Sequence, residues 1–166
     1  ILKLGLLHPP GDLSLDDVRG AVLNVARYNV DKLRQALLDG DPARCARLLE
    51  GLKGEGEAPL LVLWALTSEI RSLANLRQGL DDGQPLPALL KAERVFDERR
   101  KQGMQRALPR LPSSALRTAI LHAARIDRMI KGLVGGDVWA GNPGWQQKNL
   151  FDQCDGLHRV ADLKNH

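Results

Sequence analysis

The residues best suited to binding chemistry are the Lys and Arg side chains gathered in residues 91–131. This stretch carries 11 Lys or Arg against 4 Asp or Glu, whereas residues 1–90 and 132–166 are both slightly acidic. Guanidinium and ammonium groups bind phosphates through charge and hydrogen bonds, so a basic stretch can lie near nucleic acid. The candidates are Arg99, Arg100, Lys101, Arg106, Arg125, Arg128 and Lys131. A solvated helix surface explains the same charges, and both interpretations stay open.

No motif predicts a catalytic or metal site. The sequence contains no G-x-x-x-x-G-K-[ST], no G-x-G-x-x-G and no G-x-S-x-G pattern. Cys45 and Cys154 lie far apart, which favours reduced thiols of a cytoplasmic protein over a disulfide or a zinc site. The histidines lack metal-ligand spacing; they are His8, His122, His158 and His166. We therefore expect no catalytic residue, no cofactor and no metal.

Length and composition set the frame for the fold. The 166 residues are 43% hydrophobic and 27% charged, which is typical of one globular domain or of one domain with a fragment of another. No apolar run approaches the roughly 18 residues that a membrane span needs, so we expect no membrane partner. The sequence begins at Ile1 without an initiator Met, and we expect it to be a piece of a longer chain.

One long helix is predicted over residues 58–80, with Pro59 in its first turn. No charge occurs between Leu60 and Leu66, so this end should be buried nearly all round, and charges return to a solvent face from Glu69 onward. The apolar positions expected in the core are Leu60, Leu63, Trp64, Ile70, Leu73, Ala74 and Leu80. The helix is either a core element without chemistry or one whose apolar surface is partly buried by a partner chain.

A second long helix is predicted over residues 114–133, with Ser113 or Ser114 as its N-cap. Its expected core positions are Leu116, Ile120, Ala123, Ala124, Ile130 and Leu133. Shorter helices joined by Gly, Asp and Pro are predicted near residues 14–27, 30–38, 43–52 and 98–108, and a short segment around 87–95 leads into the last of them. The first of these begins in a capping box formed by Ser14 and Asp17. No strand pattern occurs, so the predicted fold class is an all-α helical bundle.

Several blocks occur in an order that resembles a known family. They are L-S-L-x-x-V-x-x-A-V at 13–22, A-L-L-D-G at 36–40, and L-x-x-E-G-x-x-P at 52–59, followed by an apolar helix that ends in E-I-R at 69–71. A-R-I-D-R-M-I-K-G then precedes D-V-W at 137–139. This order resembles the C-terminal part of the delta subunit of the bacterial DNA polymerase III clamp loader. The family continues with a last apolar helix, where this sequence has Ala-Gly-Asn-Pro-Gly at 140–144.

The resemblance implies a division of labour. Residues 1–28 would end a lid domain of the AAA+ type, and residues 29–166 would form a helical collar that joins the gamma/tau and delta-prime subunits. The family grips the sliding clamp through an N-terminal part that this sequence does not contain, and primed DNA would pass near the basic stretch. The expected role is non-catalytic. Candidate interface residues for these partners, on the two long helices, are Trp64, Arg71, Ile120 and Met129.

Two alternatives come from other classes of protein. An autonomous helical domain could bind nucleic acid through its basic stretch, with a steep dependence on salt. A helical lid or substrate domain could belong to an enzyme whose catalytic residues lie elsewhere, although no catalytic constellation in this sequence supports it.

Overall fold

The computed structural model describes residues 28–139, and every regular element in this range is a helix. The all-α prediction is therefore confirmed. Residues 28–39 are helical, and the elements that follow are α2 (Pro42–Gly54), α3 (Pro59–Asp81), α4 (Leu86–Ala92), α5 (Glu98–Ala107), the short 3-10 helix η2 (Leu108–Arg110) and α6 (Ser113–Ile130). The predicted capping box at Ser14, the lid segment 1–28 except its last residue, and the tail 140–166 lie outside the described residues.

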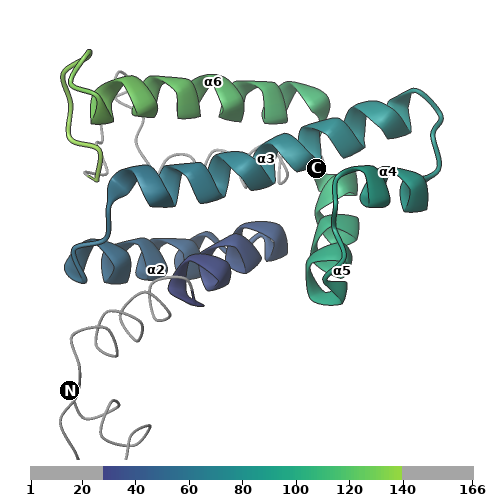
Figure 1. Ribbon diagram of the computed structural model, residues 1–166, viewed down its shortest axis with the longest axis horizontal. Coiled ribbons are helices and arrows are strands. Elements are labelled where there is room, and N and C mark those ends of the chain that lie inside the picture. Colours follow the sequence, from purple (N-terminus) through teal and green to yellow (C-terminus); the bar gives the residue numbers. More distant parts are fainter. Residues whose placement is uncertain (1–27, 140–166) are drawn as a thin grey trace, which may run out of the picture.

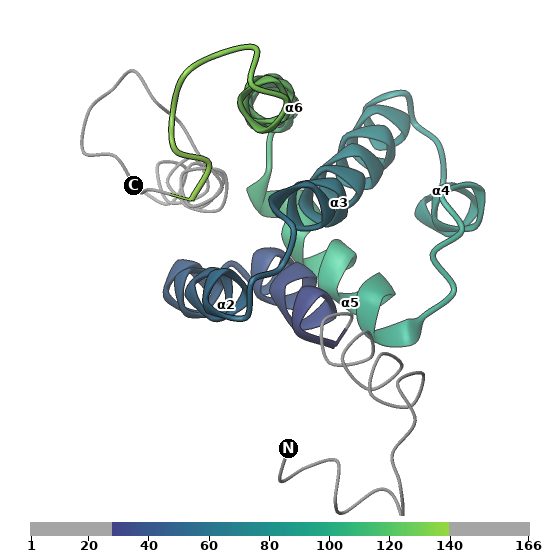
Figure 2. The ribbon, with the colours of Figure 1, turned by 60° about the vertical axis from the view of Figure 1, so that its left-hand side comes forward.

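Helix α3 runs through the middle of the described domain (Figure 1). α6 lies along one side of it, while α2, the 28–39 helix and α5 lie on the other, an arrangement that both ribbon views show (Figure 2). Pro59 begins α3 as predicted. The apolar side chains that α3 contributes to the core are Val62, Leu63, Ala65, Leu66, Ile70, Leu73 and Leu76.

Two predictions for α3 were wrong. Leu60 and Trp64 are 50% and 62% exposed instead of buried, and Leu61 next to them is also exposed. Glu69, expected at a solvent face, is 1% exposed. The reason is that neighbouring helices cover α3 from two sides and leave another side exposed. Hydrophobic periodicity alone does not specify which side of the helix stays exposed.

Helix α6 packs on α3 through small and branched side chains. Leu116 and Ala123 are buried as predicted, together with Ala115, Ala119, Ile126 and Met129. The predicted core positions Ile120 and Ile130 are only partly buried, and Ala124 and Leu133 are exposed. The alanines on the buried stripe allow α6 to approach α3 closely, so the packed face is narrower than the large apolar side chains alone suggest.

The start of α6 also differs from the prediction. Pro112 occupies the N-cap position, and no side chain caps the helix there. The Ser113 hydroxyl instead donates to Asp81 Oδ2 at the end of α3, at 3.0 Å, while Arg77 donates to Asp81 Oδ1 at 2.6 Å. These hydrogen bonds, Arg77 first and Ser113 second, lower the pKa of the Asp81 carboxyl below its ordinary value. The contact joins the end of α3 to the beginning of α6.

A tight turn at Gly40 ends the 28–39 helix and begins α2. Gly40 has a φ of +75°, and the Asp41 N–H donates back to the Ala36 carbonyl at 3.1 Å, as in a Schellman motif. The Asp41 side chain then accepts from the Arg44 N–H at 2.8 Å and caps α2. The guanidinium of Arg110 lies against Gly40 and donates to the Leu38 carbonyl at 2.6 Å.

We expect Gly40→Ala to lower the free energy of unfolding by about 1–2 kcal/mol, because an L residue with positive φ is strained. The new methyl group also meets the Arg110 guanidinium. Urea denaturation of the two proteins measures the difference.

Gly51→Ala is the matched control, since Gly51 lies inside α2 and an added Cβ there would meet nothing within 4 Å. That change should stabilise the chain by about 0.5–1 kcal/mol through helix propensity. Equal effects of the two substitutions would contradict the role assigned to Gly40.

Candidate partner-binding surface and basic side chains

The basic stretch 91–131 is divided between two surfaces. Arg99, Arg100, Lys101 and Arg106 belong to α5, whereas Arg125 and Arg128 belong to α6 and Lys131 directly follows it. Helices α5 and α6 lie on opposite sides of α3 (Figures 1 and 2). The single basic region of the sequence therefore does not form a single basic patch.

Arg100 is held by a buried carboxylate. Its Nε lies 2.9 and 3.1 Å from the two carboxylate oxygens of Glu69, a residue of α3 that is almost completely buried. The Arg100 backbone N–H donates to Asp97 Oδ2 at 2.7 Å, so Asp97 caps the start of α5. Because Glu69 needs this cation, Arg100 serves the packing of α5 on α3 and has little charge left for a ligand.

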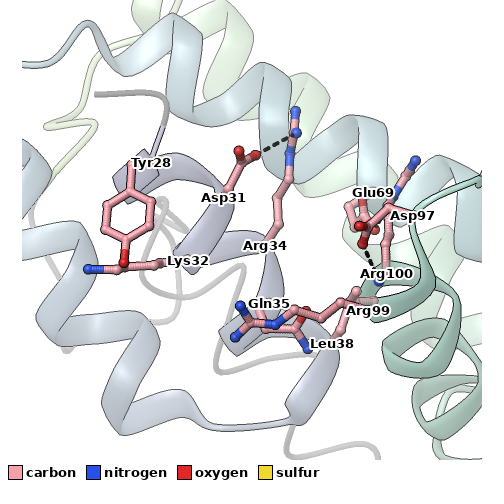
Figure 3. A pocket seen from close by; sticks show the side chains of 10 residues that line it. All are labelled: Tyr28, Asp31, Lys32, Arg34, Gln35, Leu38, Glu69, Asp97, Arg99 and Arg100. Carbon is pink, nitrogen blue, oxygen red and sulfur yellow. Dashed lines mark hydrogen bonds and ion pairs between the residues drawn. The ribbon is translucent and has the colours of Figure 1, made fainter. Parts of the chain in front are cut away.

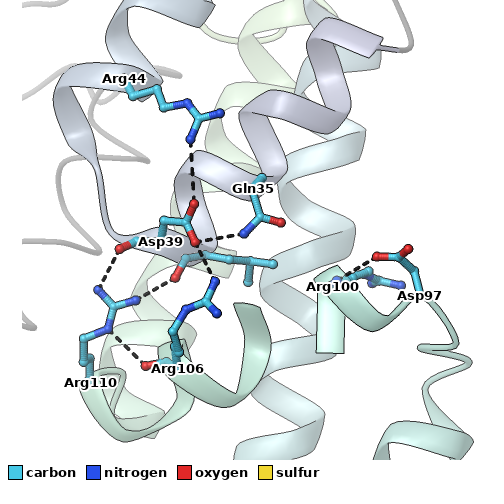
Figure 4. Close-up of polar contacts among 8 residues, drawn as sticks. Gln35, Asp39, Arg44, Asp97, Arg100, Arg106 and Arg110 are labelled. Atoms are coloured by element: carbon cyan, nitrogen blue, oxygen red, sulfur yellow. Dashed lines mark hydrogen bonds and ion pairs between the residues drawn. The ribbon is translucent and has the colours of Figure 1, made fainter. Parts of the chain in front are cut away.

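A second network surrounds Asp39 at the end of the 28–39 helix (Figure 4). Asp39 Oδ1 accepts from Arg106 at 2.9 Å and from Gln35 at 2.8 Å, and its Oδ2 lies 3.7 Å from an Arg44 nitrogen. The nearby Arg110 donates to backbone carbonyls at the same helix end. One carboxylate thus connects the 28–39 helix with α2 and α5, and it occupies Arg106.

Two more of the predicted cations form local ion pairs: Lys101 with Glu98 at 3.4 Å, and Lys131 with Asp127 at 2.6 Å. Arg125 is half-buried. Arg99 and Arg128 are exposed and form no ion pair within residues 28–139. Arg117 on α6 is also exposed and forms no ion pair within these residues. It belongs to the basic stretch but was not among the predicted candidates.

The four candidate interface residues fall into two pairs. Trp64 and Arg71 lie seven residues apart, two helical turns, and both are exposed on one side of α3. Ile120 is partly buried against the core, and Met129 is 5% exposed, with its methyl group beside Gly136. Only the first pair is open to a partner in the described domain. We call the exposed side of α3 formed by Leu60, Leu61, Trp64 and Arg71 the Trp64 face.

A cleft of about 390 Å³ lies near this face, and Figure 3 shows the side chains that line it. Its walls come from the 28–39 helix and the start of α5, with Glu69 of α3 between them. The guanidinium of Arg34 lines the cleft and also lies 5.7 Å from the centroid of the Trp64 ring. Lys32 places its ammonium 4.0 Å over the ring of Tyr28. No sequence pattern indicated Tyr28, Lys32 or Arg34, because only packing brings their helix beside α5.

Other kinds of site find no support in the part of the chain that the structure describes. No group of three or more His, Cys, Asp or Glu side chains comes together there as a metal site would require. Among the same residues, no helix is long and apolar enough to cross a membrane.

Comparisons with known proteins identify the class. The family model described as the C-terminal part of the processivity clamp loader gamma complex of DNA polymerase III matches residues 31–146. The chain is 36% identical over 138 residues to DNA polymerase III subunit delta of Escherichia coli, covering 83% of this chain and 40% of that protein. It is 28% identical over 144 residues to the same protein of Haemophilus influenzae, covering 82% of this chain and 42% of that protein.

These matches define the class of protein as a clamp-loader family. The chain belongs to the family formed by the C-terminal part of the DNA polymerase III delta subunit, as the order of its sequence blocks predicted. It spans about two fifths of the length of these relatives.

We expect Arg100→Ala to lower the free energy of unfolding by about 3 kcal/mol, because it leaves the Glu69 carboxylate buried without its cation. This value is at the lower end for a buried pair, since the Arg100 side chain is 31% exposed. Chemical denaturation of the purified chain measures the loss.

Lys101→Ala, one residue further along α5, is the matched control. It removes a solvent-exposed pair with Glu98 and should cost about 0.5 kcal/mol or less. If both variants lose equal stability, the Glu69 contact does not hold α5 in place.

Proposed function

We propose that this chain is the part of a clamp-loader delta subunit that joins it to the gamma/tau and delta-prime subunits. In this role it takes part in loading the sliding clamp on primed DNA during replication, without catalysing a reaction itself. The observation that carries the proposal is the Trp64 face, an exposed apolar surface on the central helix of a domain that belongs to this family.

The chemistry of this face suits a protein partner. Trp and Arg are enriched among the residues that contribute most to protein interfaces. Arg34 lies over the Trp64 ring, and Arg71 is exposed two turns further along α3. Burying apolar surface contributes a favourable free energy of about 25 cal/mol per Å². The domain leaves Leu60, Leu61 and Trp64 exposed, so a partner that covers them would gain this free energy. A stable interface needs roughly 800 Å² from each partner, which a helical domain of this size can present.

The proposal extends to the organisation of the chain. Residues 29–166 form the collar, and residues 1–28 are the end of an AAA+-like lid domain. Contact with the sliding clamp belongs to a preceding N-terminal part of the full-length protein. The complex acts in the cytoplasm, where bacterial DNA is replicated.

Assembly with purified partners tests this function. We expect the full-length delta protein that includes this chain to form a stoichiometric complex with gamma/tau and delta-prime, measured by size-exclusion chromatography with light scattering. Trp64→Ala should weaken assembly at least tenfold, since a central interface Trp contributes about 2 kcal/mol or more. A folded delta protein that forms no complex with these partners would contradict the proposal.

Direct binding to nucleic acid is a second candidate function, favoured by the exposed arginines of α5 and α6 that make no ion pair within the described residues: Arg99, Arg117 and Arg128. If DNA is bound, replacing these three by Glu should reduce affinity for a primed duplex and flatten its salt dependence, measured by fluorescence anisotropy. Replacing Arg100 or Arg106 is not informative, because each bonds a carboxylate of the domain. An unchanged affinity of the triple variant would exclude this candidate.

A further inference from the structure

We infer that the Trp64 face and the adjoining cleft receive one segment of a partner protein, which sets an apolar side chain against Trp64 and a carboxylate against Arg99. The inference rests on the proposed function, since it names the chemistry of the partner that this surface fits. It is carried by four features: the exposed apolar residues, the charges of the cleft, the position of Arg34 between them, and the carboxylates that make the cleft unsuitable for phosphates.

The apolar half of the surface lies on the first turns of α3. Leu60 and Trp64 are one helical turn apart, and Leu61 precedes Trp64 by three residues, so the three side chains are neighbours. All three are exposed, although their end of α3 carries no charge. A single exposed apolar residue is ordinary, but a neighbouring group that includes Trp marks a binding surface.

The charged half is the cleft, where four cations face three carboxylates. Each carboxylate already has a partner: Glu69 pairs with Arg100, Asp31 with Arg34 at 3.1 Å, and Asp97 caps α5. Of the cations, Lys32 and Arg99 form no ion pair within residues 28–139. An incoming carboxylate therefore finds Arg99 available, and Lys32 adds positive potential on the opposite wall.

Arg34 connects the two halves. Its guanidinium bonds Asp31, lies over the Trp64 ring and lines the cleft at the same time. The distance of 5.7 Å from this cation to the ring centroid is within the range of a cation–π contact. The Trp64 face and the cleft are thus continuous, and one segment of chain can contact both.

The same cleft is poorly suited to nucleic acid. A phosphate backbone needs several unneutralised cations along its path, whereas the cleft offers two beside three carboxylates that repel phosphate. Asp31 is two-thirds exposed at its mouth. An amino-acid carboxylate needs only one guanidinium. The apolar residues nearby cannot form hydrogen bonds or ion pairs with a phosphodiester. The surface therefore favours an apolar and acidic protein segment.

The test compares charge reversals in the full-length delta protein, titrated with purified gamma/tau and delta-prime. Arg99→Glu should weaken assembly about tenfold, and the remaining affinity should depend less on salt than that of the unchanged protein. Arg117→Glu is the matched control: it makes the same charge change on α6, at an exposed Arg that also forms no ion pair in the described residues. It should change the affinity less than twofold.

The apolar half has its own pair of variants. Trp64→Ala should weaken assembly at least tenfold and Trp64→Phe less than threefold, because Phe keeps a ring against the partner. Leu121→Ala on α6, a side chain that is 64% exposed, should have no effect. Circular dichroism and thermal unfolding show whether each variant is folded, and Trp64→Phe keeps the test valid if Trp64→Ala is not.

The outcomes separate this inference from the proposed function. If assembly occurs but Arg99→Glu behaves like Arg117→Glu, the acidic segment is overturned while the function stands. If no complex forms with the unchanged protein, the proposed function itself fails. If Arg99→Glu leaves assembly intact and lowers affinity for primed DNA, the cleft serves phosphates instead.

Discussion

The buried carboxylate of Glu69 is the constraint around which this domain is arranged. A charge removed from water in the middle of α3 requires a cation with good geometry, and Arg100 supplies it from α5. Because Asp97 fixes the start of α5 through the Arg100 N–H, the same residue sets both the position and the beginning of that helix. Without this contact α5 would lose its charged link to α3, and the wall that it gives to the cleft beside the 28–39 helix would be held less firmly.

Three arginines of this domain have structural roles. Arg106 and Arg110 fasten the end of the 28–39 helix through Asp39 and the carbonyls beside it, and Arg100 neutralises Glu69. The C-terminal end of a helix leaves carbonyls without internal partners. A guanidinium placed there donates hydrogen bonds to these carbonyls and interacts favourably with the negative end of the helix dipole. Part of the charge of a basic stretch can therefore serve internal contacts, which leaves fewer cations for a ligand than the sequence suggests.

The two long helices expose different chemistry. The Trp64 face of α3 is apolar and continues into a cleft with available cations, whereas the outer side of α6 carries separated arginines around one exposed leucine, Leu121. In a family whose members are components of a clamp loader, the first surface has the composition of a protein interface. The second lacks a comparable apolar group, and it therefore provides suitable control positions.

The sequence by itself determined the helices and their approximate bounds, because helical periodicity, proline and glycine act locally. The order of its blocks determined the family. Only part of the predicted core stripes of α3 and α6 is buried: Leu63, Ile70, Leu73, Leu116 and Ala123. The sequence could not decide that Trp64 is exposed, that Glu69 is buried, or that Arg100 and Arg106 are occupied by carboxylates 31 and 67 residues away. It also could not predict that Lys32 and Arg99 line the same cleft. These features depend on which face of each helix a neighbour covers, and that choice is made only when the helices pack together in three dimensions.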